Sequence, residues 1–456
     1  MKRIMIAGTH SGCGKTTITC AILAALKARN MKVSSFKCGP DYIDPMFHRR
    51  VIGVEAHNLD SFFCNDDTLK YLLYENSQNA DISVIEGVMG FYDGVDGRGS
   101  AHSVSTITET PVVMVVDCKG ASESIGAMIK GFLEYKKPNM ITGFIFNRLP
   151  ERLVPRVKEM CRELDTEFLG YMPTNSFTIG SRKLGLVTAD EITDFKEKIA
   201  ELCELAEKNI CLDKLISLSD APYPEFTEPK VHRIYKNYHP KIAVARDEAF
   251  CFIYSDNIAL LKKIGCRIEY FSPLGDKKLP QNCCGLILSG GYPELYAEKL
   301  SENTEMINSI RSAIFCGIPT IAECGGFMYL HEKMGLADNN TLKMVEAING
   351  EVYPTEKLRR FGYIKMKANN NCFLCEKSDE IAAHEFHYWD STNCGNSFTA
   401  YKSDGRNWNC VHADNTLYAG FPHLYFYSDI RIAERFAEKC AEYGGMNGTD
   451  KKDITD

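Results

Sequence analysis

The chain has 456 residues, of which 45% are hydrophobic and 25% charged, with a formal net charge of −7. This length exceeds one typical hydrophobic core, so we expect two domains. The acidic balance argues against a nucleic-acid-binding protein. The first apolar run is too short for a signal sequence or a membrane span, which predicts a cytoplasmic protein without a membrane partner. The nineteen cysteines are then expected to be free thiols, most of them small core residues.

The first 17 residues predict a nucleotide-binding P-loop. A buried strand at 4–7 leads into a glycine-rich turn, and a helix starts at Lys15. Glycines let the backbone N–H groups of such a turn point at phosphate oxygens. Lys15 would reach the terminal phosphates and the Thr16 hydroxyl would ligate Mg²⁺, although Thr9 stands where the strict pattern has glycine. The ATP-binding residues predicted in this loop are Gly12, Gly14, Lys15, Thr16 and Thr17.

Carboxylates stand at or just beyond the ends of two predicted strands. A loop with two prolines and a glycine carries Asp41 and Asp44, and we expect no regular structure there. The next buried strand ends on Glu86, and Asp93 follows it closely. The carboxyl ends of parallel strands form the ligand-binding edge of a sheet, so these four acids are candidates to hold metal or position substrate, with Thr16 and Glu86 on Mg²⁺. The alternative for Asp41 and Asp44 is the capping of a local turn.

Apolar runs alternate with helical segments through the first 212 residues, which predicts a parallel α/β sheet. The strands expected after the first are 32–36, 81–86, 112–116, 141–147 and 168–170, and the helices are 17–29, 122–135 and 150–164. Asn147 closes one of these strands and is a candidate for adenine contact. Prolines gather at 213–240, where we expect a linker. The predicted organisation is an ATP-binding domain at 1–212, a linker at 213–240, a second α/β domain at 241–445 and a polar tail at 446–456.

The second domain carries the form of a nucleophile elbow. Its expected strands are 241–247, 266–273, 285–291, 318–322 and 416–420, and its expected helices are 255–264 and 327–334. Cys324 lies between one of these strands and a helix, and two glycines follow it. A tight strand-to-helix turn exposes such a side chain and activates it as a nucleophile. Gly290 and Gly291 end another strand and are candidates to stabilise an oxyanion through their backbone N–H groups.

A thiol nucleophile needs a base, and His423 is the best candidate because it follows a predicted strand of the same sheet. His384 and His387 favour structural or substrate-edge roles. They follow Cys372 and Cys375, but the spacing misses the usual zinc-binding pattern, so a metal site is the less favoured interpretation.

Eight stretches together resemble the cobyrinic acid a,c-diamide synthase family over nearly the whole chain. They are GTHSGCGKTT, FKCGPDYIDPMFH, IEGVMGFYDG, LSGGYPELY, AECGGFMYL, RRFGYI, HEFHYW and GFPHLYF. The resemblance implies an N-terminal domain similar to dethiobiotin synthetase and a C-terminal class I glutamine amidotransferase domain. It implies that Cys324 attacks the glutamine amide and that His423 raises the nucleophilicity of Cys324. Ammonia would then meet a substrate carboxylate that ATP has converted into an acyl phosphate.

The activity implied by the resemblance is the amidation of the a and c acetate carboxylates of cobyrinic acid in cobalamin biosynthesis. Mg²⁺ would be the cofactor, ATP and glutamine the co-substrates, and a corrinoid or related tetrapyrrole the acceptor, in a monomer or homodimer. Tyr425 stands where other class I amidotransferases have the glutamate that orients their histidine. We therefore predict a Cys-His pair without a third member.

Several alternatives stay open at the level of sequence. Synthases that amidate hydrogenobyrinic acid or nickel-sirohydrochlorin act on similar side chains, and no residue separates them. Cobyric acid synthase has a similar plan, but the GPDYIDP loop favours the a,c-diamide branch. A nucleotide-switch ATPase with an inactive amidotransferase domain is an alternative of another class. Partitioning ATPases carry a lysine where this chain has His10, and the intact Cys324 also argues against this alternative.

Overall fold

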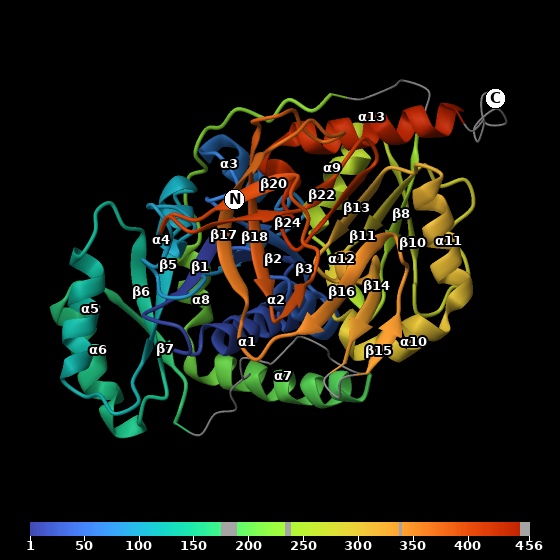
Figure 1. Cartoon of the computed structure of the whole chain (residues 1–456). Helices are drawn as coiled ribbons and strands as arrows, with labels where there is room; N and C mark the ends of the chain where they lie inside the picture. The colour runs from blue at the N-terminus through green and yellow to red at the C-terminus, as the bar shows by residue number, and fades with distance from the viewer. Residues whose placement is uncertain (175–188, 233–238, 337–339, 447–456) are drawn as a thin grey trace. The chain divides into compact units, whose positions relative to one another are not determined.

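The computed structural model of the chain describes residues 1–174, 189–232, 239–336 and 340–446. The chain divides into two compact units, Met1–Pro229 and Lys230–Asp456 (Figure 1). Each unit is built around a largely parallel sheet, which confirms the predicted α/β class. Of the predicted polar tail, residues 447–456 lie outside the described part of the chain.

The first unit is built on a seven-stranded sheet in which all neighbouring strands are parallel. In spatial order the strands are β3 (Glu55–Leu59), β2 (Val33–Cys38), β4 (Ile82–Glu86), β1 (Arg3–Gly8), β5 (Val112–Asp117), β6 (Ile141–Asn147) and β7 (Glu167–Tyr171). The central strands are buried along almost their whole length, which explains why they are continuous apolar runs in the sequence. Strand β3 is not predicted from the sequence, because EAHNL has little of the β-branched and aromatic character typical of strands.

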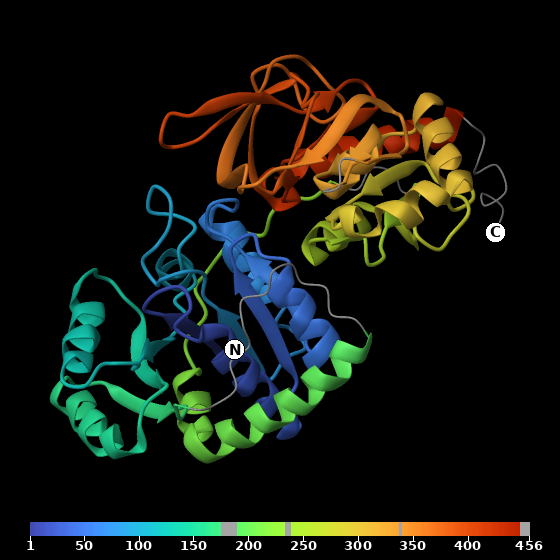
Figure 2. The ribbon, with the colours of Figure 1, turned by 60° about the horizontal axis from the view of Figure 1, so that its bottom comes forward.

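Eight helices accompany this sheet among the described residues. They are α1 (Lys15–Ala28), α2 (Ile43–Phe47), α3 (Asp66–Glu75), α4 (Ala101–Ile107), α5 (Ser124–Glu134), α6 (Val154–Glu163), α7 (Ala189–Asn209) and α8 (Leu212–Leu218). Short helical turns at His48–Ile52 and Glu151–Leu153 complete the unit. Figures 1 and 2 both show α7 running beside α1, and Phe195, Ile199 and Leu202 of α7 join the core that α1 and the sheet share. A second layer of helix thus closes this face of the sheet.

The structure corrects the prediction of an irregular loop after β2. Residues Ile43–Phe47 form α2, so Asp44 lies in the first turn of a short helix. Pro45 is compatible with this helix because the first turn makes no use of its missing N–H group. Asp41 Oδ1 accepts hydrogen bonds from the backbone N–H groups of Ile43 and Asp44, at 2.8 and 3.2 Å. The capping role that was the alternative for this loop is therefore present at Asp41.

The boundary between the two units falls inside the predicted linker at 213–240, but the first part of that segment packs on the first unit. Helix α8 contributes to the core of this unit. The guanidinium of the buried Arg3 donates hydrogen bonds to the carbonyl oxygens of Ala221 and Pro222, at 3.0 and 2.6 Å. The prolines fit a segment that runs extended along the first unit. Proline has no N–H group to donate, but the carbonyl groups of an extended segment can still accept hydrogen bonds from the unit.

The second unit is built on a six-stranded sheet with an antiparallel strand at one edge. In spatial order the strands are β10 (Arg267–Phe271), β8 (Lys241–Ala245), β11 (Gly285–Leu288), β13 (Thr320–Glu323), β23 (Leu417–Gly420) and β22 (His412–Ala413). Only the pairing of β22 with β23 is antiparallel in this sheet. The described helices are α9 (Ser255–Ile264), α10 (Ala297–Glu302), α11 (Thr304–Phe315), α12 (Gly325–Tyr329) and α13 (Ile430–Met446), with helical turns at Pro293–Tyr296 and Phe426–Ser428.

Three smaller sheets complete the second unit, and most of their strands are not predicted from the sequence. A two-stranded sheet pairs β12 (Gly290–Gly291) with β9 (Phe250–Phe252). A four-stranded sheet contains β15 (Thr341–Lys343), β14 (His331–Gly335), β16 (Ile348–Pro354) and β19 (Trp389–Ser391). A five-stranded sheet contains β21 (Asn407–Cys410), β20 (Phe398–Tyr401), β17 (Arg360–Ala368), β18 (Glu380–His387) and β24 (His423–Leu424), and Figure 1 shows β17 and β18 as its long central pair.

The predicted helix at 327–334 is wrong in its second half. Helix α12 ends at Tyr329, and β14 begins at His331. Short apolar runs fit a buried helix and a buried strand equally well, and here pairing with β15 and β16 decides for the strand. Among the described residues, no helix is both long enough and apolar enough to cross a membrane.

Gly326 lies where α12 approaches β11. A Cβ atom on Gly326 would lie 2.1 Å from the backbone oxygen of Leu288. We therefore expect Gly326→Ala to lower the free energy of unfolding of this unit by about 3 kcal/mol. Gly445→Ala is the matched control, because nothing lies within 4 Å of its Cβ position in α13 and alanine favours helix by up to about 1 kcal/mol. Urea unfolding followed by the fluorescence of Trp389 and Trp408, both in this unit, measures the difference, and equal midpoints would contradict it.

Candidate active sites

The turn between β1 and α1 has the backbone conformation of a phosphate-binding loop. Gly12 and Gly14 have φ angles of +81° and +99°, which glycine adopts without strain. Lys15 is 7% exposed, and its Nζ donates hydrogen bonds to the carbonyl oxygens of His10 at 3.1 Å and Met89 at 2.5 Å. Burial lowers the pKa of Lys15. The ammonium is thereby held over the turn, and it also ties the segment after β4 to the loop.

Asn147, at the end of β6, packs behind the same turn. Its side chain is buried, and Nδ2 donates a hydrogen bond to the carbonyl oxygen of Cys13 at 2.9 Å. A Cβ atom on Gly14 would lie 2.0 Å from that nitrogen, so only glycine allows this contact. The amide therefore braces the loop. Contact with adenine stays a prediction.

Lys37 and three carboxylates form a buried ionic cluster beside the loop. Lys37 Nζ lies 2.8 Å from Glu86 Oε1 and 3.9 Å from Asp41 Oδ2, and it also pairs with Asp44. The parallel register of β2 and β4 places Lys37 opposite Glu86. Thr16 Oγ1, from the start of α1, donates a hydrogen bond to Glu86 Oε1 at 2.6 Å. The four site residues predicted from separate segments, Thr16, Asp41, Asp44 and Glu86, thus lie together in the structure. Lys37, which contacts all three carboxylates, is not among the site residues predicted from the sequence.

Burial and mutual repulsion shift the pKa values of this ionic cluster. Burial and the Asp44 carboxylate raise the pKa of Glu86 to about 7. The same two causes raise the pKa of Asp41 to about 6. Burial alone would raise the pKa of Asp44, but the charge of Lys37 outweighs this effect and holds that pKa below its usual range. Burial alone would lower the pKa of Lys37, yet the three carboxylates raise it well above the ordinary value. Glu86 is therefore able to exchange a proton near neutral pH.

Thr16 and Glu86 fit the predicted magnesium site by their donor chemistry. Mg²⁺ prefers oxygen ligands, and it is commonly held by one or two carboxylates together with substrate phosphates. Glu86 Oε2 is buried and accepts no hydrogen bond within the described structure. His48 Nε2 lies 3.6 Å from this oxygen, and burial lowers the pKa of His48 to about 4, so this ring is neutral. An acceptor oxygen beside the phosphate loop is therefore available to a cation.

The described contacts of Asp93 are with the turn after β4 and not with the ionic cluster. Asp93 is exposed, and its Oδ2 accepts a hydrogen bond from the backbone N–H group of Gly90 at 2.9 Å. The turn that carries it is held at the phosphate loop, because the N–H group of Phe91 donates to the carbonyl oxygen of Gly8 at 2.9 Å. Asp93 thus faces solvent near the loop, where a substrate would have access to it.

Cys324 occupies the sharp turn between β13 and α12. Its φ and ψ angles are 47° and −102°, a conformation that residues with a side chain rarely adopt. Cys324 is 6% exposed. A Cβ atom on Gly325 would lie 3.0 Å from the backbone nitrogen of Gly291. The predicted oxyanion donor Gly291 therefore lies beside the turn that carries the predicted nucleophile.

His423 begins β24, and its buried side chain is hydrogen-bonded to Cys324. A Cβ atom on Gly290 would lie 2.5 Å from His423 Cε1, so the glycine lets the ring approach. Burial alone would lower the pKa of His423, but the thiolate of Cys324 and the carboxylate of Glu323 raise it to about 10. The ring of His423 therefore lies between the thiol-bearing residue and a carboxylate, which favours the protonated form of the ring.

The structure corrects the prediction that His423 has no acidic partner. Glu323, the residue before Cys324, is 8% exposed, and its Oε2 lies 3.6 Å from His423 Nδ1. Tyr425, at the position where the acid usually stands, instead donates its hydroxyl hydrogen to Asp256 Oδ2 at 3.1 Å. The acid thus reaches the histidine from β13. The signal in the sequence was a carboxylate at the end of a strand that neighbours the strand before His423.

The remaining histidine and cysteine candidates fall into two places. His384 lies opposite His423 in the pairing of β18 with β24, with ring centroids 6.3 Å apart, and His387 lies further along β18. The thiols of Cys372 and Cys375 lie 3.4 Å apart in the loop before β18. Among the described residues, no group of three or more His, Cys, Asp or Glu side chains is arranged to hold a metal ion.

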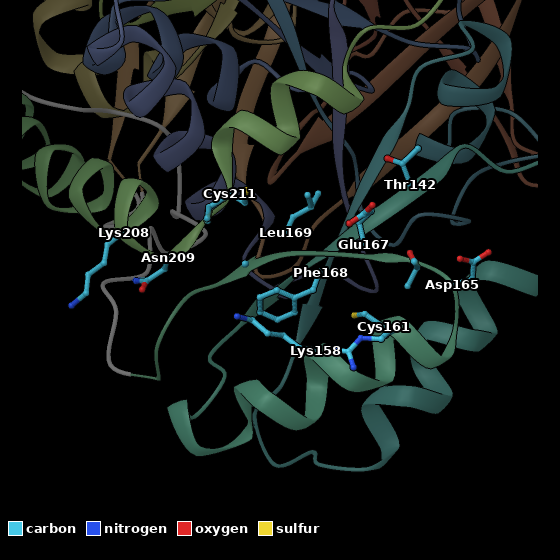
Figure 3. A pocket seen from close by; sticks show the side chains of 14 residues that line it. Thr142, Lys158, Cys161, Asp165, Glu167, Phe168, Leu169, Lys208, Asn209 and Cys211 are labelled. Carbon is cyan, nitrogen blue, oxygen red and sulfur yellow. The ribbon is translucent and has the colours of Figure 1, made fainter.

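A cavity of about 690 Å³ lies at the edge strand β7 of the first unit (Figure 3). Residues of β7, β6 and α6, the end of α7 and the segment after it line this cavity, and Lys158 stacks on Phe168 with its nitrogen 5.2 Å from the ring centroid. None of its lining residues is a predicted site residue. The cavity is therefore separate from both candidate active sites.

Comparison with known proteins identifies a domain in each of the two units. Residues 4–183 match the model of the CobQ/CobB/MinD/ParA nucleotide binding domain, and residues 241–430 match the CobB/CobQ-like glutamine amidotransferase domain. The chain is 38% identical over 448 residues to a cobyrinate a,c-diamide synthase of Caldanaerobacter subterraneus subsp. tengcongensis, covering 96% of this chain and 98% of the relative. It is 37% identical over 454 residues to that of Priestia megaterium, covering 96% and 97%. It is 39% identical over 410 residues to that of Methanocaldococcus jannaschii, covering 88% and 90%. The chain therefore belongs to the cobyrinate a,c-diamide synthase family and is an ATP-dependent amide ligase with a glutamine amidotransferase domain.

Proposed function

We propose that the chain amidates the a and c acetate carboxylates of cobyrinic acid, using ATP and glutamine, in the cytoplasm and as a step of cobalamin biosynthesis. The observation that carries the proposal is the presence of two complementary centres in one chain. The phosphate loop with its ionic cluster suits the activation of a carboxylate. The Cys324–His423 pair suits the release of ammonia from glutamine. Relatives named for this reaction match over nearly the whole chain, which supports the choice of substrate.

In the second unit, the thiolate of Cys324 attacks the side-chain carbonyl carbon of glutamine. The imidazolium of His423 gives its proton to the departing ammonia, which leaves a glutamyl thioester. His423 then takes a proton from the water that hydrolyses the thioester. The backbone N–H group of Gly291 stabilises the oxyanion that forms in both steps.

In the first unit, an oxygen of the substrate carboxylate attacks the γ-phosphorus of ATP, and ADP leaves an acyl phosphate behind. Lys15 and the N–H groups of the loop stabilise the charge of the transferred group. Thr16 and Glu86 would hold Mg²⁺, which neutralises phosphate oxygens when it is bound. Ammonia then attacks the acyl carbon and expels phosphate. Asp41 suits the acceptance of the proton that ammonia loses, while Asp44 keeps Lys37 in place and Asp93 positions the substrate.

Release of ADP by the purified chain with Mg-ATP and glutamine tests this proposal. Cobyrinic acid, hydrogenobyrinic acid and nickel-sirohydrochlorin are compared as acceptors, and the product mass is read alongside. We expect cobyrinic acid to stimulate ADP release and to lose about 1 Da twice, as each hydroxyl group becomes an amino group. Turnover of another macrocycle would change the substrate. If no tetrapyrrole stimulates ADP release, the nucleotide-switch alternative takes the place of the proposal.

The acyl phosphate has its own test. Cobyrinic acid labelled with ¹⁸O in its carboxylates is converted, and the inorganic phosphate is analysed by mass spectrometry. An acyl phosphate carries one carboxylate oxygen into phosphate for each amide formed. Unlabelled phosphate would exclude the intermediate without excluding amidation.

Glu86→Gln and Asp93→Asn should both impair synthesis from either nitrogen source. We expect a fall of about 100-fold in ammonia-dependent amidation, because removal of one preorganised charged group from such a site typically has this effect. Glu123→Gln is the matched control, since Glu123 is an exposed partner of Arg156 in the same unit. The rates of ADP release with glutamine and with ammonium chloride are compared. A normal ammonia-dependent rate in both variants would remove these residues from the site.

A further inference from the structure

Glu323 stands in contact with the glutaminase centre, although none of the bond-making or proton-transfer steps uses it. Its Oε2 lies 3.6 Å from His423 Nδ1, and its Oε1 accepts a hydrogen bond from the backbone N–H group of Leu424 at 3.1 Å. One carboxylate thus contacts both the ring of the histidine and the backbone that follows it. We propose that Glu323 is the positioning acid of this centre, which orients His423 and stabilises its imidazolium beside Cys324. This inference rests on the proposed function only in taking Cys324 as the nucleophile.

The topology explains how an acid from β13 reaches this histidine. In the parallel pairing of β13 with β23, Glu323 lies opposite Gly420, three residues before His423. The chain then leaves this sheet, and β24 pairs with β18. The histidine therefore stands just beyond the end of the strand that Glu323 terminates. An acid placed after the histidine is not needed, and Tyr425 contacts Asp256 instead.

Other ionisable groups near His423 do not replace Glu323. The groups that face the ring from neighbouring elements are Cys324, Glu323, His384, Glu385 and His387. Burial lowers the pKa of His384 to about 3 and that of His387 to about 4, so both stay neutral. Glu385 faces Arg360 at 3.9 Å, and burial raises its pKa to about 7. Among the described residues, Glu323 is the carboxylate at ion-pair distance from the ring.

If Glu323 acted only through its hydrogen bond with Leu424, it would be a structural residue. The experiment must therefore detect the effect of its negative charge on His423 and Cys324. Replacement of Glu323 by glutamine keeps the shape and the acceptor for Leu424 but removes the negative charge. The imidazolium of His423 then loses a stabilising partner, so the pKa of the ring falls and the ring supports the reactive form of Cys324 less well at neutral pH. A structural role predicts a change in stability and no change in the pH profile.

The experiment measures the rate of alkylation of Cys324 by iodoacetamide between pH 5 and pH 10, resolved by peptide mass spectrometry. For Glu323→Gln we expect the midpoint of the profile to move up by about one pH unit. Alkylation would be about tenfold slower near pH 7 and nearly unchanged at pH 10. Cys316, an exposed thiol of the same unit, is the internal reference in every sample. In glutaminase assays we expect kcat to fall while the KM for glutamine stays the same.

Three further variants make the result decisive. Glu385→Gln is the matched substitution of a buried acid and should move the profile less. Glu323→Asp keeps the charge and should lie between the wild type and Glu323→Gln. In a His423→Asn background, Glu323→Gln should add no further shift, because the acid acts through the histidine. An unchanged profile for Glu323→Gln, or an equal shift without His423, would overturn the proposal.

This test is independent of the acceptor substrate. Alkylation needs neither ATP nor a tetrapyrrole, so a failure of the proposed amidation would leave the result on Glu323 intact. Glu323→Gln should also keep the wild-type rate of ammonia-dependent amidation. Loss of that rate in a folded variant would count against a role confined to the glutaminase centre.

Discussion

Cys324→Ala will abolish amidation from glutamine and leave amidation from ammonia intact. We expect the glutamine-dependent rate to fall by at least about 1,000-fold, because removal of a nucleophile eliminates the covalent route and leaves only binding and oxyanion stabilisation. The ammonia-dependent rate should stay within twofold of the wild type, since the proposed synthetase chemistry belongs to the first unit. ADP release with glutamine and with ammonium chloride measures both rates on the same preparation.

Cys316→Ala provides the control for this prediction. Cys316 is an exposed thiol at the end of α11, in the same unit as Cys324. Its replacement should leave both rates unchanged. Loss of both activities in a folded Cys324→Ala variant would contradict the division of labour between the two units. A retained glutamine-dependent rate would place the nucleophile elsewhere in the chain.

Lys37→Met will destabilise the first unit by about 3–5 kcal/mol at pH 8. The substitution removes the cation shared by Asp41, Asp44 and Glu86 and leaves these carboxylates without a counter-charge. Urea unfolding followed by far-UV circular dichroism measures the loss. The fluorescence of Trp389 and Trp408 reports only the second unit, so that transition should keep its midpoint.

The pH dependence of this loss has a definite sign. Without Lys37, burial and mutual repulsion raise the carboxyl pKa values of the folded state above those of the unfolded chain. The folded variant then binds more protons than the unfolded one, so its stability rises as the pH falls. The deficit relative to the wild type should shrink between pH 8 and pH 5. Lys214→Met, which removes an exposed ion pair with Glu167, is the control and should change stability by less than about 1 kcal/mol at either pH.

Structural features formed by one short, continuous segment of the chain were predictable from the sequence. The phosphate loop and the Cys324 elbow each consist of a strand, a glycine-rich turn and a helix in one short segment. The family resemblance is confirmed for the same reason, because its motifs are local. The parallel sheets also followed from the alternation of apolar runs and helical segments.

Features that depend on pairing between distant segments were not predictable. Lys37 meets Glu86 because β2 and β4 share a register, and a lysine within a strand carries no sign of that register. Glu323 meets His423 although 100 residues separate them along the chain. The strand β14 was mistaken for helix because its partners β15 and β16 come later in the chain. In each case tertiary pairing supplied information that the local pattern lacks.

The contacts of Arg3 and α7 show how much of the chain the first unit needs in order to fold. The match to the nucleotide-binding model ends at residue 183, yet the core of the first unit includes side chains of α7, and Arg3 is tied to Ala221 and Pro222. A gene fragment that stopped at the end of the match would encode an incomplete fold. The segment that encodes a complete first unit therefore extends to Pro229. A recombination junction between relatives leaves both units whole when it falls between Pro229 and Lys230.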